Sequence, residues 1–205
     1  MWAAGTLSVL TATSAAGDAA ISIDVHLRFN HHQPPAELVA AMQVEAAAIW
    51  KLYGIELRWQ SPAGHNNGPT SFDVLLDQAR YADASMALGD ARLAAQSHEY
   101  VAIRLDRAAT EHLLRHVTFE QVARLTGHAS VQHDDEGRAL GRVLAHELGH
   151  ALLATREHQA KGLMRSAFTG EELLTSARDS YRLSAVETTR LRSALAVRHH
   201  SADDY

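Results

Sequence analysis

Residues Val143–Leu153, VLAHELGHALL, contain the pattern His-Glu-x-x-His at His146, Glu147 and His150. The stretch is expected to be helical. On a helix each residue advances by about 100°, so His146 and His150, four residues apart, lie on one face with rings that can converge on one ion. Glu147 lies beside them. The pattern therefore predicts a metal site with a carboxylate next to it.

The apolar residues around this pattern favour a metal site over the alternative, a solvated helix face that carries two histidines. They form a stripe that would bury the helix: Leu140, Leu144, Leu148, Ala151 and Leu152. His146 and His150 lie about 130° away from the stripe, which predicts a cleft rather than open water. Imidazole nitrogens at about 2.0–2.1 Å suit zinc, and two helical histidines leave room for a third protein ligand and a water molecule. We therefore expect one catalytic Zn²⁺.

The residues after the helix supply a third histidine, His158, followed by the tripeptide Gly162–Met164, GLM. This order resembles the metzincin zinc peptidases, in which a third histidine and a tight turn with a methionine under the metal follow the HExxH helix. The resemblance implies that His146, His150 and His158 bind the metal. It also implies that Glu147 is the catalytic residue and that the methionine supports the site without coordinating.

The spacing departs from the usual metzincin pattern HExxHxxGxxH, which would require glycine at Leu153 and histidine at Arg156. The stretch is more similar to a longer-spaced variant in bacterial metalloprotease-like proteins, HExGHxLLG, a few residues, a histidine, then a G-[IL]-M turn. Ala154 stands where that variant has glycine. The chain is therefore expected either to leave the helix at a residue with positive φ or to continue through Thr155 and Arg156 before turning.

Composition limits the classes of partner. The 205 residues are 46% hydrophobic, enough for one domain with a core. The net charge of −5, from 19 basic and 24 acidic residues without a basic cluster, predicts no nucleic-acid partner. Cysteine is absent, which excludes thiol catalysis and cysteine-ligated zinc. No stretch reaches ~18 continuous apolar residues, so no transmembrane segment is expected.

The chain is expected to form a single domain over residues 21–205. Residues 1–20 are small and weakly apolar, and they fit either a disordered terminus or the remnant of an export signal. The second alternative would favour a secreted or periplasmic protein.

The hydrophobic pattern predicts alternating strands and helices. Strands are expected over Ile21–Phe29, with His26 facing outward, and over 55–59, 72–77 and 99–106, with an edge strand or irregular segment over 86–93. Helices are expected over 35–53, 107–116, 119–125 and from about Gly137, and after capping boxes at Thr169 and Ser184. The order resembles the metzincin α+β fold, a mixed-sheet upper lobe over the HExxH helix with a small helical C-terminal lobe.

The expected function is zinc-dependent hydrolysis of peptide bonds in a peptide or protein substrate. Zinc polarises the scissile carbonyl and activates a water molecule, and Glu147 takes the proton as general base. An extended substrate would pair with an exposed edge strand.

Two other functions stay open. A glutamate-ligand zinc peptidase, resembling bacterial proteases that cleave phage-type repressors, would use Glu171 or Glu172 as the third ligand, and Glu157 is the nearest rival to His158. The second is a non-catalytic protein that binds zinc for structure or for a partner. Intact Glu147 argues against it, because a structural site needs no general base.

Two smaller hypotheses concern residues near the motif. Arg165 and Tyr181 are candidates to stabilise an oxyanion by their chemistry alone. His133, Asp134 and Asp135 could form a second metal site, although acidic residues at a helix N-terminus explain the same pattern.

Overall fold

A computed structural model of the chain describes residues 20–30, 32–60, 71–78, 87–93 and 101–202. Most of the expected terminal segment 1–20 and the loop after Gln60 lie outside these residues.

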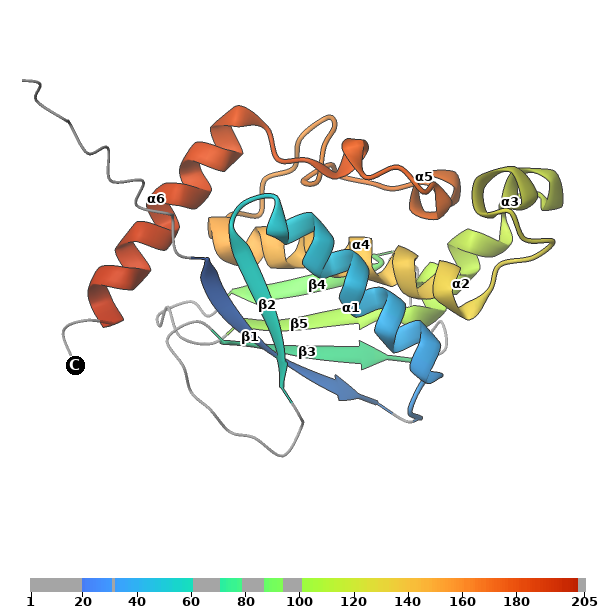
Figure 1. Cartoon of the computed structure of the whole chain (residues 1–205), viewed down its shortest axis with the longest axis horizontal. Helices are drawn as coiled ribbons and strands as arrows, with labels where there is room; N and C mark the ends of the chain where they lie inside the picture. Colours follow the sequence, from blue (N-terminus) through green and yellow to red (C-terminus); the bar gives the residue numbers. More distant parts are fainter. Residues whose placement is uncertain (1–19, 31, 61–70, 79–86, 94–100, 203–205) are drawn as a thin grey trace, which may run out of the picture.

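The centre of the fold is a five-stranded mixed sheet with the strand order β2-β1-β3-β5-β4 (Figure 1). Neighbouring strands pair in parallel from β2 to β5, and β4 pairs antiparallel with β5 at the edge. The strands are β1 (Ile21–Phe29), β2 (Ile55–Gln60), β3 (Ser71–Asp77), β4 (Gly89–Leu93) and β5 (Val101–Asp106). The predicted α+β class with a mixed sheet is confirmed, and the segment before Leu93 forms the edge strand.

Seven helical segments complete the described chain. They are α1 (Ala36–Lys51), α2 (Arg107–Arg115), α3 (Phe119–Thr126), α4 (His133–Leu153), α5 (Gly170–Leu174), the 3₁₀ turn η1 (Asp179–Tyr181) and α6 (Ala185–Ala202). The capping boxes that open α5 and α6 are confirmed: the N–H of Thr169 donates to the Glu172 carboxylate and the N–H of Ser184 to that of Glu187. Within the described ranges, no helix has the length and apolar character needed to cross a membrane.

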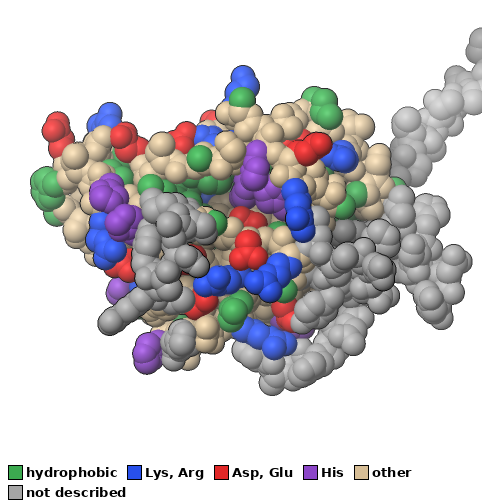
Figure 2. Space-filling view, turned by 180° about the vertical axis from the view of Figure 1, so that it is seen from behind, with side chains coloured by type: hydrophobic (Ala, Val, Ile, Leu, Met, Phe, Trp, Pro, Cys, Tyr) green, Lys and Arg blue, Asp and Glu red, His purple; other side chains and the backbone are tan. Residues whose placement is uncertain are grey.

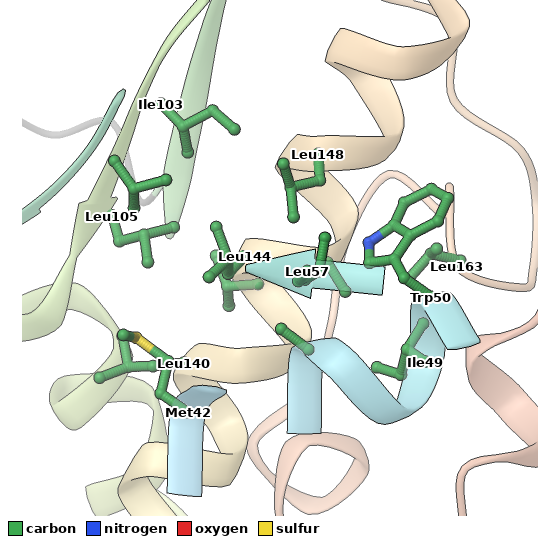
Figure 3. Packing of buried hydrophobic residues seen from close by; sticks show 14 of the residues in the cluster. Met42, Ile49, Trp50, Leu57, Ile103, Leu105, Leu140, Leu144, Leu148 and Leu163 are labelled. Carbon is green, nitrogen blue, oxygen red and sulfur yellow. The ribbon is translucent and has the colours of Figure 1, made fainter. Parts of the chain in front are cut away.

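The apolar stripe of α4 forms the middle of the core, as predicted. Figure 3 shows Leu140, Leu144 and Leu148 lying among side chains of the sheet and of α1, including Ile103, Leu105, Met42, Ile49 and Trp50. Leu140, Leu144 and Leu148 have no exposed surface. A β-carbon at Gly141 would lie 2.6 Å from the carbonyl oxygen of Met42, so α1 and α4 approach closely along this line. The helix that carries HExxH is therefore held by the core on one side.

Two local expectations were wrong. Helix α4 begins at His133 rather than near Gly137, because the Asp135 carboxylate accepts the N–H of Gln132 and acidic residues occupy the first turn, where the helix dipole favours them. His26, which was expected to face outward, is buried, because β1 lies inside the sheet between β2 and β3, where His26 is flanked by Gln60 and Asp73.

Candidate metal centre

Three imidazole nitrogens converge on the face of α4 that is turned away from the apolar stripe. The Nε2 atoms of His146 and His150 are 3.0 Å apart, and those of His150 and His158 are 3.2 Å apart. Nitrogens that share one ion tetrahedrally at about 2.0–2.1 Å would be about 3.3–3.4 Å apart. The three predicted ligand residues are thus brought together at separations that suit an ion of the size of zinc.

Backbone carbonyls fix which nitrogen of each helical histidine is available. The Nδ1 of His146 lies 2.7 Å from the carbonyl oxygen of Leu163, and the Nδ1 of His150 lies 2.8 Å from that of Thr155. A carbonyl oxygen only accepts, so both Nδ1 atoms carry the proton and donate it. Each Nε2 is left with a lone pair directed toward the shared point, as in metal-ligating histidines.

At the end of α4 the chain leaves the helix at a residue with positive φ, which is the first of the two expected possibilities. Ala154 adopts a left-handed conformation with φ 48° and ψ 47°, a conformation that costs a non-glycine residue about 1–2 kcal/mol. The backbone N–H of Ala154 and that of Thr155 both donate to the carbonyl oxygen of His150. The reversal places the Thr155 carbonyl at the Nδ1 of His150 and returns the chain so that His158 faces the two helical histidines.

The Gly162–Met164 turn contacts helix α4 through Leu163 and Met164, and the segment after α5 through Gly162 and Leu163. Gly162 has φ 90°, and a β-carbon there would lie 2.6 Å from the carbonyl oxygen of Arg182. The Leu163 N–H donates to the same oxygen at 2.8 Å, and its own carbonyl accepts from His146. Met164 is buried, and its sulfur lies against Gly149 of α4. The turn thus supports the helix beneath the histidine pair.

Glu147 lies between the histidines and the edge strand. Its side chain is 6% exposed, and Gly89 of β4 is so close that a β-carbon there would lie 2.9 Å from the Cγ of Glu147. Burial, and secondarily the charge of Asp90, raises the pKa of Glu147 to about 8. From behind, Figure 2 shows histidine, acidic and basic side chains close together near the middle of the surface.

The two helical histidines, His146 and His150, have lowered pKa values, which favours the binding of a cation. Burial lowers the pKa of His146 to about 4, with further lowering from His150 and His158. Burial also lowers the pKa of His150. Metal binding requires neutral imidazole, so these shifts remove proton competition at neutral pH. A bound cation would in turn favour the ionised carboxylate of Glu147.

The rival third ligands make contacts elsewhere. The Glu172 carboxylate accepts the N–H of Thr169 and pairs with Arg165, while the Glu171 carboxylate accepts from Gln121. The Glu157 side chain is 77% exposed and lies 3.8 Å from Arg190. Among the described residues, His158 is the one that completes a group of three potential metal ligands with His146 and His150.

Arg165 and Tyr181 bind the C-terminal segment rather than standing free. Arg165 donates to the carbonyl oxygens of Gly162 and Ser180. The hydroxyl of Tyr181 donates to the carbonyl oxygen of Glu172 at 2.7 Å, and burial raises the pKa of Tyr181 to about 12. These contacts give both residues a structural role.

The proposed second acidic site is explained by helix capping. Its ligand atoms would come from Asp134, Asp135 and His128 rather than from His133. The Asp135 carboxylate already accepts the N–H of Gln132 and contacts His128 and Arg138.

Arg142 supports the site and was not predicted from the sequence. It lies four residues before His146 and has no exposed surface. Its Nε donates to buried Glu45 of α1 at 2.9 Å, and its Nη1 donates to the carbonyl oxygens of Glu172 and Leu173. It therefore ties α1, α4 and the segment after the turn together. A charged residue within the largely apolar stretch 139–145, just before the histidine pair, was the available signal.

No protein-family profile matches the sequence, and a search of curated proteins finds no significantly similar sequence.

Proposed function

We propose that this protein is a zinc-dependent peptidase of metzincin-like type, with His146, His150 and His158 as metal ligands and Glu147 as general base. The observation that carries the proposal is the convergence of three Nε2 atoms on one side of α4, with the Glu147 carboxylate beside them. The helix, the reversal at Ala154 and the methionine turn all contribute to this arrangement.

The donor set fits zinc in chemistry as well as in spacing. Three imidazoles, two of them with tautomers fixed by backbone carbonyls, leave one tetrahedral position open, which is typical of catalytic rather than structural zinc sites. When bound there, zinc polarises a carbonyl group and lowers the pKa of water towards ~7.

In the proposed reaction, Glu147 moves the proton that hydrolysis requires. Its carboxylate takes a proton from the attacking water and delivers it to the amine nitrogen of the leaving group. Assistance of this kind is typically worth about 10²–10⁴ in rate. Because Glu147 is not in the group of ligand atoms, it acts on turnover rather than on metal binding.

The position of β4 at the edge of the sheet is an argument for a peptide as the substrate. Among the described residues β4 is the last strand of the sheet, and it pairs antiparallel with β5 on one side only. An extended peptide can add to such an edge through backbone hydrogen bonds. Contact between Gly89 and Glu147 would bring a peptide on this edge next to the general base.

The two alternative functions have less support. A glutamate-ligand peptidase would need Glu171 or Glu172 among the histidines, whereas their carboxylates contact Gln121, Thr169 and Arg165. A non-catalytic zinc protein does not need a buried carboxylate at Glu147.

The proposal is tested by incubating zinc-loaded protein with a mixed peptide library and identifying products by mass spectrometry. We expect cleavage by the parent, loss of cleavage with a chelator, and restoration by zinc. Glu147→Gln should keep its zinc and lose cleavage, while Glu157→Gln, an exposed control nearby, should retain it. A Glu147→Gln protein that cleaves like the parent, or a zinc-loaded parent that cleaves nothing, would contradict the proposed activity.

A further inference from the structure

Helix α2 carries a second histidine pair whose geometry repeats that of the pair on α4. The Nε2 atoms of His112 and His116 are 3.0 Å apart, the same separation as between His146 and His150. The ring centroids are 4.6 Å apart in both pairs, with interplanar angles of 79° and 88°. Two donor atoms are therefore directed at one point on α2 as they are on α4.

From this repetition we infer that His112 and His116 form a second metal site, separate from the site on α4, for a divalent first-row transition ion. Imidazole suits zinc, copper and nickel, and histidines four apart on a helix can bind one ion together. Two protein ligands with water in the remaining positions make this site weaker than a three-histidine site. The inference does not depend on peptidase activity.

The backbone that carries the pair is held in place before any ion binds. Helix α2 opens with an N-cap in which the Asp106 carboxylate accepts the N–H of Ala109 at 2.8 Å, and Leu114 is buried. His116 is exposed and His112 half-buried, so an ion can reach them from solvent. A helix already fixed by its cap and core contact loses little freedom when the ion binds.

The local charge also permits a cation. Arg115 lies between the two histidines in sequence, and its guanidinium pairs with the Glu111 carboxylate at 3.3 Å. The negative partner offsets much of the repulsion that a lone arginine would exert on a metal ion.

The test is calorimetric titration of Ni²⁺ into untagged protein that already holds one equivalent of Zn²⁺. We expect one Ni²⁺ to bind to the parent, and its affinity to fall at least about 10-fold in His112→Ala and in His116→Ala. His32→Ala removes an exposed histidine from a loop and should bind Ni²⁺ like the parent.

Equal Ni²⁺ binding by the parent and both α2 variants would overturn the inference and leave the pair as a hydrogen-bonded contact. Absence of Ni²⁺ binding by the parent would overturn it as well. His116→Gln provides a conservative check, and circular dichroism verifies that each variant remains folded. Retained Zn²⁺ in each variant shows that the loss belongs to α2 and not to the site on α4.

Discussion

The sulfur of Met164 lies against Gly149, on the turn of α4 between His146 and His150, so closely that a β-carbon at Gly149 would overlap it. The preceding residue of the turn, Leu163, accepts the Nδ1 proton of His146. The Leu163 carbonyl therefore orients the ring of His146, and the contact between Met164 and Gly149 sets how closely the turn approaches α4.

We expect Gly149→Ala to push the methionine turn away from α4. Overpacking of this kind typically costs about 1–3 kcal/mol of unfolding free energy. Because the turn also carries the Leu163 carbonyl, zinc affinity should fall by about 10–100-fold, the usual effect of disturbing a group that orients a ligand. Urea unfolding and zinc titration measure the two effects.

The methionine supplies the control for this substitution. Met164→Leu conserves volume and should cost less than about 1.5 kcal/mol. Combining Gly149→Ala with Met164→Ala removes the overlapping sulfur, so the double variant should be more stable than the sum of the single changes predicts. Strict additivity would mean that the two residues are not in contact.

Gly89→Ala should reduce peptide hydrolysis without releasing zinc. The new methyl group would lie 2.9 Å from the Cγ of Glu147 and 3.0 Å from the carbonyl oxygen of Arg104, so the carboxylate must move. We expect kcat to fall at least about 10-fold, since general base assistance is worth about 10²–10⁴. Arg92→Ala, which alters an 80% exposed side chain on the same strand, is the control and should retain kcat. Unchanged kcat in Gly89→Ala would show that Glu147 tolerates the intrusion.

Glu45→Ala should destabilise the fold strongly, because it leaves Arg142 buried without its negative partner. Removing one member of a buried ion pair typically costs about 3–5 kcal/mol. Glu111→Ala breaks the exposed pair with Arg115 and should cost about 0.3–0.5 kcal/mol. Urea unfolding curves for both variants give the comparison, and similar costs would contradict the structural role assigned to Arg142.

Much of the fold followed from local patterns. Alternation of apolar and polar residues predicted β1, β2 and β5, and β3 was predicted as the strand that follows a loop. The capping boxes at Thr169 and Ser184 predicted the starts of α5 and α6. The positions of His146, Glu147 and His150 on one helix also followed from spacing alone. These features depend on residues close together in the sequence.

The remaining features depend on residues far apart in the sequence. The neighbour of Glu147 on the edge strand is Gly89, and a glycine gives no chemical signal of such a contact. The Glu45–Arg142 pair joins two helices that no local pattern aligns. His26 was misjudged because alternation alone does not reveal which strand lies inside a sheet.

Zinc titration of His158→Ala against Glu157→Ala tests the three-histidine site most directly. The Nε2 of His158 is 3.2 Å from that of His150, while the Glu157 side chain is 77% exposed. Losing one of three ligands should weaken zinc binding by far more than the 10–100-fold typical of residues that only support a ligand. We therefore predict a large loss of zinc affinity in His158→Ala and parent-like binding in Glu157→Ala. Parent-like binding by His158→Ala, with the loss appearing instead in Glu157→Ala, Glu171→Ala or Glu172→Ala, would contradict the assignment of His158 as the third ligand.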